Sequence, residues 1–455
     1  MDFILLRFVI VLMLPSLLMP TAHAFDIKNE AGLELTVFSE HGAQQQSQTA
    51  SSLHLQIDVH DQVDKEQQIN IRLFGRWDQQ DEHRTHVDVR EYTWLSSKGS
   101  KQWRVGVGQV FWGVTEGAHL VDIINQTDAI ESLDGDVKLG QPMVNMSWEH
   151  DAHLVDIYLL PFSRERVFAS QKGRLRLPWL VDTDNASYES GAKNHHLDAA
   201  IRYQFNDKGL RAGFSIFSGT AREPELTPHI DPSQIVFTGF IPTAFIGNYQ
   251  PTLRPYYPLI QQAGLDAQYI VGDWLWKIET IHRQGMAQDF TATDVGVEYT
   301  QVGAFGSTID IGWLAEYLTD SRGSQATTAF EHDLLLGWRL AFNDTASSEL
   351  LAGVVSDIHH HEQAWRLKGS TRLNDRLKLA IEARVFISQD PPSALQLLTT
   401  SNNDNKLTAL ANDSFVRTDI MWFFCGINMA SLKAVEAWSD RSIQFLAQWI
   451  VAHPW

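Results

Sequence analysis

The chain has 455 residues, a formal net charge of −19 and a single cysteine, Cys425. One cysteine excludes an internal disulfide and a cysteine-based metal centre. An acidic chain also lacks the basic surface of a nucleic-acid-binding protein, so we expect no nucleic-acid partner. The sequence has no Pro/Gly/Ser-rich linker, internal repeat or break in composition, which favours one large unit over several small domains.

The first segment, residues 1–24, has the features of a secretory signal peptide. An apolar run is followed by small residues at Ala22 and Ala24. This pattern predicts cleavage after Ala24 and an exported chain that begins at Phe25. The alternative is a transmembrane anchor, but this run is shorter than the roughly 18 apolar residues that cross a bilayer, and no other stretch reaches that length.

Between residues 25 and 424, apolar and polar side chains alternate with period two in segments about 10 residues long, whereas soluble strands average about five or six. Long alternating strands are typical of outer-membrane barrels, whose strands turn an apolar face to lipid and a polar face to the lumen. We therefore predict an all-β, transmembrane antiparallel β-barrel of about 18 strands, with about 16 as the alternative. The clearest segments are 33–39, 53–60, 69–78, 197–204, 274–283, 309–317, 333–340, 377–387 and 413–424.

The connectors between these segments alternate between short and long, as in outer-membrane barrels with tight periplasmic turns and long external loops. One segment, 85–95, fits poorly because Glu91 would face lipid in a regular strand. A β-bulge or a position at the membrane interface would accommodate Glu91. The expected periplasmic turns are 61–66, 96–100, 150–152, 206–209, 272–273, 301–306, 342–347 and 374–375, and the long external loops are 111–141, 161–193, 219–262, 319–328 and 389–412.

The most specific motif runs from Arg104 to Asp128. It resembles a motif in a broad group of proteobacterial outer-membrane β-barrels with porin-like or alginate-export-like character, in which Arg-x-Gly-x-Gln leads into Trp-Gly and then Asp-x-Ile-Asn-x-x-Asp. Gly108 departs from the group's spacing. The resemblance implies a channel or exporter but no particular substrate. The matching residues are Arg104, Gly106, Trp112, Gly113, Asp122, Ile124, Asn125 and Asp128.

The loop that carries this motif, residues 111–141, is rich in carboxylates, with Lys138 as its only lysine or arginine. We hypothesise that it folds into the lumen and faces inward basic residues across a constriction. The alternative is a solvated external loop. From the stretch between Arg104 and Asp128, we assign five polar residues to the constriction: Arg104, Glu116, Asp122, Asn125 and Asp128.

Basic side chains on the late strands are predicted to face inward, and closure of the barrel would bring them near Arg72 and Arg76. A basic wall would favour anionic solutes. Alternatively, these residues pair with loop carboxylates and hold the lumen together, which the acidic composition favours. The residues are Arg366, Lys368, Arg372, Lys378, Arg384 and Arg417, and we assign Arg72, Arg76, Arg366, Lys368, Arg384 and Arg417 to the pore lining.

A second basic run lies in the predicted external loop 161–193. It could bind lipopolysaccharide phosphates or neighbouring acidic loops, or it could simply be solvated. The run comprises Arg164, Arg166, Lys172, Arg174 and Arg176.

The sequence contains no His-x-Ser pair, nucleophile elbow, Walker loop or zinc-protease motif. The run His359-His360-His361-Glu362 could supply metal ligands, but consecutive strand residues point to opposite faces, which is poor geometry for one ion. We therefore expect no catalytic residue, metal site or cofactor.

The last clear segment, 413–424, places Arg417 and Asp419 on one face and ends in Phe424. It resembles the closing strand of bacterial outer-membrane barrels, whose terminal aromatic is read by the barrel-assembly machinery. The resemblance implies that machinery as a partner. Residues 425–455 follow, and we expect them to form a C-terminal appendage outside the barrel, although the alternation over 443–451 makes that segment a rival last strand.

Together, these features predict one outer-membrane barrel over residues 25–424, in contact with lipid and lipopolysaccharide. Its leading function is that of a porin or export channel for polar or anionic solutes, or for a secreted polymer or lipid-like cargo. The alternatives are a barrel enzyme that acts on lipid and a surface adhesin that binds a partner through residues 219–262.

Overall fold

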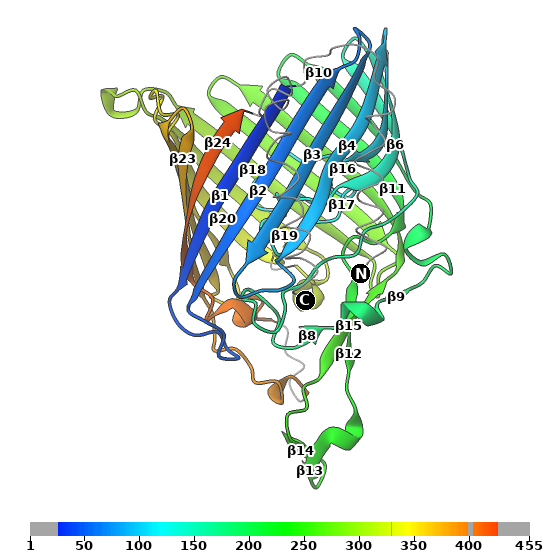
Figure 1. Ribbon diagram of the computed structural model, residues 1–455, viewed down its shortest axis with the longest axis vertical. Coiled ribbons are helices and arrows are strands. Elements are labelled where there is room, and N and C mark those ends of the chain that lie inside the picture. The colour runs from blue at the N-terminus through cyan, green and yellow to red at the C-terminus, as the bar shows by residue number, and fades with distance from the viewer. Residues whose placement is uncertain (1–25, 329, 399–403, 426–455) are drawn as a thin grey trace, which may run out of the picture.

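A computed structural model describes residues 26–328, 330–398 and 404–425. An 18-stranded antiparallel sheet closes on itself, because β1 (Asp26–Phe38) pairs with β24 (Phe415–Cys425). The predicted all-β barrel and its strand number are confirmed (Figure 1). The other barrel strands are β2 (Thr49–Gln62), β3 (Gln67–Asp78), β4 (His86–Lys98), β5 (Lys101–Gly108), β6 (Gln141–His150), β7 (His153–Leu160), β10 (Asp198–Asp207), β11 (Leu210–Thr220), β16 (Leu259–Val271), β17 (Trp274–Gln284), β18 (Phe290–Gln301), β19 (Asp310–Asp320), β20 (His332–Ala341), β21 (Glu349–Asp357), β22 (Gln363–Asn374) and β23 (Leu377–Ile387).

Shorter elements lie in the long connectors. A small sheet contains β8 (Leu180–Val181), β9 (Ser187–Tyr188), β12 (Glu225–His229) and β15 (Thr252–Tyr257), and a hairpin contains β13 (Ile235–Thr238) and β14 (Ile241–Phe245). The 3-10 turns are η2 (Thr183–Asn185), η3 (Lys193–His195), η4 (Pro232–Gln234), η5 (Ala304–Gly306), η6 (Gly323–Gln325), η7 (Gln396–Leu398) and η8 (Thr408–Leu410). Within the described residues, no helix is long and apolar enough to cross a membrane.

The two faces of each strand differ as the alternation predicts. In β1, for example, Leu35 is 49% exposed, whereas its neighbours Glu34 and Thr36 are 5% and 3% exposed. An apolar outer surface with charges inside is the reverse of a water-soluble barrel and fits a sheet surrounded by lipid. Exposed tryptophans, which prefer the membrane interface, lie near the short turns: Trp94, Trp103, Trp148, Trp274, Trp338 and Trp422.

The short and long connectors lie at opposite ends of the barrel, as predicted (Figure 1). The start of β1 and the end of β24 both lie at the short-turn end, which is the periplasmic end if this barrel has the usual orientation. The first strand begins at Asp26, earlier than the predicted Leu33, because the polar residues at its start also pair with β2. The turns comprise residues 63–66, 99–100, 151–152, 208–209, 272–273, 302–309, 342–348 and 375–376.

The misfit that we noted around Glu91 is resolved by a β-bulge. The register between β3 and β4 shifts between Arg72 and Leu73, so that Arg90 is the extra residue. A bulge reverses the alternation of the strand that carries it. Glu91 consequently faces the lumen and accepts a hydrogen bond from Thr93 at 2.9 Å.

Two predicted segments lie at least partly outside the described residues. The signal peptide, residues 1–24, is one of them, and residues 426–455 of the expected appendage are the other. Cys425, which we had assigned to that appendage, instead belongs to β24 and pairs with Lys28 of β1.

Candidate functional site

The connector from β5 to β6, residues 109–140, crosses the barrel lumen and is fixed by carboxylates on the far wall. The backbone N–H of Val114 donates to Glu279 of β17 at 2.6 Å, and that of Gly117 donates to Glu316 of β19 at 2.6 Å. These carboxylates are 0% and 1% exposed. Buried charge-assisted hydrogen bonds of this kind are strong. The loop therefore lies inside the barrel, not in external solvent. We call residues 109–140 the lumen loop.

The Trp-Gly pair of the motif has a structural role in this arrangement. Trp112 is buried and packs edge-on against Tyr158, and the guanidinium of Arg202 lies 4.9 Å from its ring. Gly113 has φ 137°, and a Cβ at this position would lie 2.8 Å from Oε1 of Glu279. Only glycine readily adopts this conformation and leaves the carboxylate free to reach the loop backbone.

Two residues that we assigned to the constriction are buried inside the lumen loop. Asn125, which is 1% exposed, accepts a hydrogen bond from Val110 N and donates to Gly108 O and Leu139 O, so it ties the two arms of the loop together. The Asp122 side chain is 0% exposed and lies 3.1 Å from Nζ of Lys138. Burial raises the pKa of Asp122, and the attraction of Lys138 opposes this shift. Both residues therefore shape the loop from within.

Four other acidic residues of the lumen loop pair with basic residues of the barrel wall. This pattern matches the interpretation in which arginines pair with loop carboxylates. Two of these basic residues, Arg90 and Arg339, were not assigned to the pore lining from the sequence. The ion pairs are Glu116–Arg339 at 2.6 Å, Asp128–Arg90 at 2.5 Å, Glu131–Arg76 at 2.8 Å, and Asp134 with both Arg366 and Arg384.

A buried network near the seam between β1 and β24 includes Arg417. Glu34 lies 2.8 Å from Arg84, 3.3 Å from Arg76 and 3.4 Å from Arg417. Glu34 and Arg84 were not singled out from the sequence, because their contact joins residues 50 positions apart in the chain. The predicted inward direction of Arg76 and Arg417 is thus observed, but their charges are largely matched by nearby carboxylates.

The other predicted pore-lining residues lie where the lumen is more open. Arg72 is partly exposed and pairs with Asp58 at 2.5 Å, and Lys368 of β22 is exposed on the inner face. Arg104 lines a cavity of about 770 Å³ beside the turn 99–100. We call it the inner cavity, because it lies at the short-turn end of the barrel. Its lining is strongly charged and includes Lys101, Arg104, Arg202, Arg211, Glu149 and Asp156.

A second cavity, of about 510 Å³, lies on the other side of the lumen loop, against β17 to β23. Residues of the external connectors, among them Arg222 and Arg322, contribute to its lining. The lumen loop thus separates an inner cavity near the short turns from an outer cavity near the long loops.

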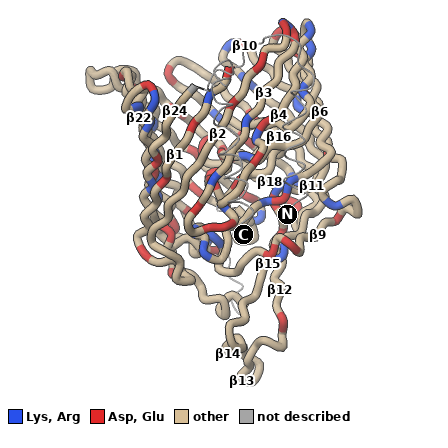
Figure 2. The backbone as a smooth tube through the Cα atoms, viewed as in Figure 1, with Lys and Arg blue, Asp and Glu red and all other residues tan. Residues whose placement is uncertain are grey.

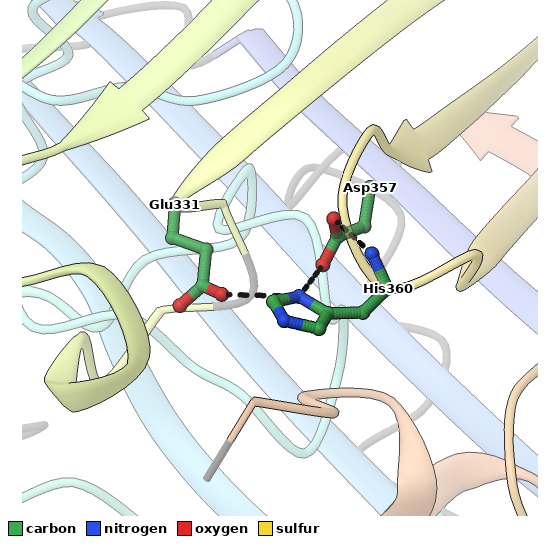
Figure 3. A group of neighbouring side chains, drawn as sticks. All are labelled: Glu331, Asp357 and His360. Atoms are coloured by element: carbon green, nitrogen blue, oxygen red, sulfur yellow. Dashed lines mark hydrogen bonds and ion pairs between the residues drawn. The ribbon is translucent and has the colours of Figure 1, made fainter.

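The histidine run forms part of a small polar cluster at the mouth of the barrel. Glu331, Asp357 and His360 are the one group of three potential metal ligands within the described residues (Figure 3). Asp357 accepts the N–H groups of His359 and His360 and contacts Nδ1 of His360 at 3.0 Å, and this hydrogen bond raises the pKa of His360. Glu331 lies 3.4 Å from Nζ of Lys406. Because these groups already have partners, the geometry favours a structural tie between loops, and we assign no metal to it.

The basic run of residues 164–176 is directed partly toward the protein. Arg164 pairs with Asp88 at 2.6 Å, and Arg174 pairs with Asp413 at 2.7 Å. Arg174 also donates to three backbone carbonyls of neighbouring external loops. These two arginines therefore bind acidic neighbours, while Lys172 remains exposed.

No protein-family model and no curated protein matches the chain. Among solved structures, it is similar to a mutant of Rh. blastica porin, with 10% identity and a TM-score of 0.40 over 88% of this chain and 100% of that chain. It is also similar to OmpT, an outer membrane protein of Vibrio cholerae in its trimer form, with 9% identity and a TM-score of 0.41 over 89% of this chain and 100% of that chain.

The chain's own architecture defines its class. A closed sheet leaves no unpaired strand edge, so all backbone groups of the wall can be satisfied within a bilayer. The outward side chains are apolar, the inward ones are charged, and the connectors alternate between short turns and long loops. The protein is an integral β-barrel of the bacterial outer membrane, in contact with membrane lipid.

Proposed function

We propose that this barrel is a porin-type channel through which small polar solutes, including anions, diffuse. The observation that supports this most is the pair of cavities, about 770 and about 510 Å³, on the two sides of a lumen loop that is held in place. A fixed loop narrows a wide barrel to the size of small solutes. Channel function needs no catalytic group, and we propose none.

The charges suggest a weak preference for anions. The loop carboxylates neutralise Arg76, Arg366 and Arg384, so a strongly basic wall is not expected. Lys368 on the inner face and Arg104 in the inner cavity remain accessible to solutes. Export of a polymer is less favoured, because the lumen loop would have to leave Glu279 and Glu316.

Planar-bilayer recording tests the channel. The purified full chain should produce discrete conductance steps with a modest anion preference in the reversal potential. A matched variant in which residues 114–137 are replaced by a short Gly-Ser linker should conduct more. Heat-modifiable gel mobility confirms that the wild-type protein is folded. If this folded protein inserts into the bilayer without conductance while the linker variant conducts, the lumen loop is a plug and the proposed function is wrong.

We propose two further partners, the barrel-assembly machinery and lipopolysaccharide, each from one feature of the chain. The aromatic end of β24, with Phe424, supports recognition by the barrel-assembly machinery, and exposed Lys172 could meet lipopolysaccharide phosphates. We also propose, from the Arg104–Asp128 motif, that the chain is related to the porin-like and alginate-export-like proteobacterial barrels that carry a similar motif.

A second candidate function is surface binding by the arm formed by β12 to β15. Its tip stands off the barrel in Figure 1 and is free of blue and red in Figure 2. Residues 232–253 contain no Asp, Glu, Lys or Arg, and Phe237, Phe240 and Ile241 are all at least half exposed. Exposed apolar patches mark interaction sites. Deletion of residues 232–250 should abolish binding to surfaces if this function holds, and should leave conductance unchanged.

A further inference from the structure

We infer that the outer cavity selects amphipathic anions, that is, solutes with an anionic head group and an apolar body. This inference rests on the proposed channel function and names the class of solute. The cavity volume, about 510 Å³, lies within the range of small-molecule sites, about 300–1,000 Å³. Its lining has an apolar part and a charged part in which six arginines outnumber five carboxylates.

The apolar part departs from the usual polar lining of a barrel lumen. Leu314 and Leu318 of β19 and Leu335 of β20 point inward and form a cluster, with Phe330 and Val355 packed against it. The lumen loop contributes Ala118 to the same surface. The three leucines are 2–9% exposed because the lumen loop and neighbouring side chains cover most of them, and the part that lines the cavity gives an apolar solute a surface on which to shed water. The apolar lining includes Ile281, Phe290, Leu314, Leu318, Leu335 and Phe386.

The arginine-rich part lies next to this surface. Arg283 and Arg322 flank the ring of Phe290, with guanidinium carbons 5.3 and 3.6 Å from its centroid. Arg322 is satisfied by a two-point contact with Asp320, in which Nε donates to Oδ1 at 3.0 Å and Nη2 donates to Oδ2 at 2.6 Å. Arg283 is less well matched, because it donates to the neutral Gln262 at 2.8 Å and its nearest carboxylate oxygen, on Glu223, lies 3.8 Å away.

Two further arginines in the cavity lining retain donors for a ligand. Nη2 of Arg222 is buried and has no hydrogen-bond partner within the described residues, although Nη1 binds Asp198 at 2.8 Å. Within the described residues, the Arg166 side chain donates only to Gln126, a neutral acceptor, at 3.4 Å. Unmatched, desolvated guanidinium donors bind carboxylates and other oxyanions strongly and with defined geometry.

Other solute classes fit this combination less well. A neutral sugar would leave the guanidinium groups uncompensated, and a small inorganic anion would leave the leucine surface uncovered. A solute with both parts satisfies both surfaces at once. The head group could be a carboxylate or another oxyanion, which share this recognition chemistry.

The test measures binding apart from conduction. Isothermal titration of the full chain in lipid nanodiscs compares 4-phenylbutyrate with its neutral amide, with the sulfonate of the same body, and with acetate. We expect 4-phenylbutyrate to bind at least about tenfold more tightly than the amide or acetate. The sulfonate shows whether the site requires a carboxylate. Equal binding of 4-phenylbutyrate, amide and acetate would overturn the inference.

Two substitutions test the arginine-rich part and the apolar part of the cavity separately. Arg283→Gln should weaken 4-phenylbutyrate about tenfold and leave the amide unchanged, whereas Leu318→Asn should weaken 4-phenylbutyrate and leave acetate unchanged. Arg376→Gln, which removes an arginine in an exposed short turn, is the matched control. A folded, conducting Arg283→Gln variant with wild-type binding would refute the inference. Binding without conductance would instead refute the channel and leave the site standing.

Discussion

Two long connectors leave the same end of the barrel and reach opposite environments. The lumen loop turns inward and donates its backbone N–H groups to buried carboxylates of the wall. The arm between β11 and β16 pairs with itself through β12 and β15 and through β13 and β14, and it extends away from the barrel (Figure 1). The arm pairs within itself and with β8 and β9 of a neighbouring connector, whereas the lumen loop is held by carboxylates of the barrel wall.

This difference teaches where each connector is vulnerable. The lumen loop is held by specific contacts to strands that are distant in sequence, so single changes in the wall should move it. The tip of the arm makes its strand pairing locally, between β13 and β14, so it should tolerate substitution with no effect on the barrel.

The double substitution Glu279→Gln with Glu316→Gln should release the lumen loop. Hydrogen bonds to charged groups contribute about 1.5–3 kcal/mol each, and these carboxylates accept several from Val114, Thr115 and Gly117. Release should increase single-channel conductance by about twofold or more, because the loop no longer obstructs the lumen. Glu349→Gln is the matched control and should conduct as wild type, because Glu349 lies at the start of β21, beside the short turn 342–348. A double variant with unchanged conductance would show that the loop is held by other contacts.

Trp112→Ala should destabilise the barrel, whereas Phe240→Ala should not. Trp112 is buried against Tyr158 at the base of the lumen loop, and Phe240 is fully exposed at the tip of the arm. Truncation of a buried tryptophan costs about 3–5 kcal/mol, and truncation of an exposed side chain about 0.5 kcal/mol or less. Urea unfolding in detergent micelles measures both. Equal effects of the two substitutions would remove the contrast between the connectors.

Asp134→Asn should increase the preference for anions. Asp134 bridges Arg366 and Arg384, so its neutralisation leaves these two guanidinium groups with Glu382 as their shared carboxylate partner at the lumen wall. We expect the anion-to-cation permeability ratio, measured from reversal potentials in a salt gradient, to rise about two- to fivefold. Asp231→Asn, in the arm, changes the charge equally and should leave the ratio unaltered. A ratio that is unchanged in both variants would place the solute pathway away from Asp134.

The sequence predicted the barrel well because its signal is local and repeated. The alternation within each strand predicts which side chains face lipid and which face the lumen. The lengths of the connectors predict which end of the barrel each one occupies. The contacts of the lumen loop are different in kind, since Glu279 and Glu316 look like any inward carboxylate until closure brings β17 and β19 opposite the loop. Nor does a sequence distinguish a polar residue that faces water from one that is buried inside a loop, which is why Asn125 was assigned to the constriction.

The smallest expected effect concerns pH and again separates the connectors. His119 and Asp136, both in the lumen loop, lie 3.1 Å apart. Burial lowers the pKa of His119, but the hydrogen bond to Asp136 and the nearby negative charges of Glu279, Asp136 and Asp122 together raise the pKa above its ordinary value of 6.5. That same hydrogen bond lowers the pKa of Asp136, which stays ionised above its ordinary value of 3.8.

The stabilisation from the His119–Asp136 pair is therefore complete below pH 6.5 and is lost as the pH rises through the raised pKa of His119. The pair is partly exposed and contributes about 0.2–1 kcal/mol. Hydrogen exchange of amides in residues 114–122 should accelerate between pH 6 and pH 9 beyond the intrinsic chemical rate, while residues 232–253 of the arm should follow the intrinsic rate alone. His119→Gln should abolish the excess acceleration. If the excess persisted in that variant, or if the loop became more protected at high pH, another titrating group would have to control the lumen loop.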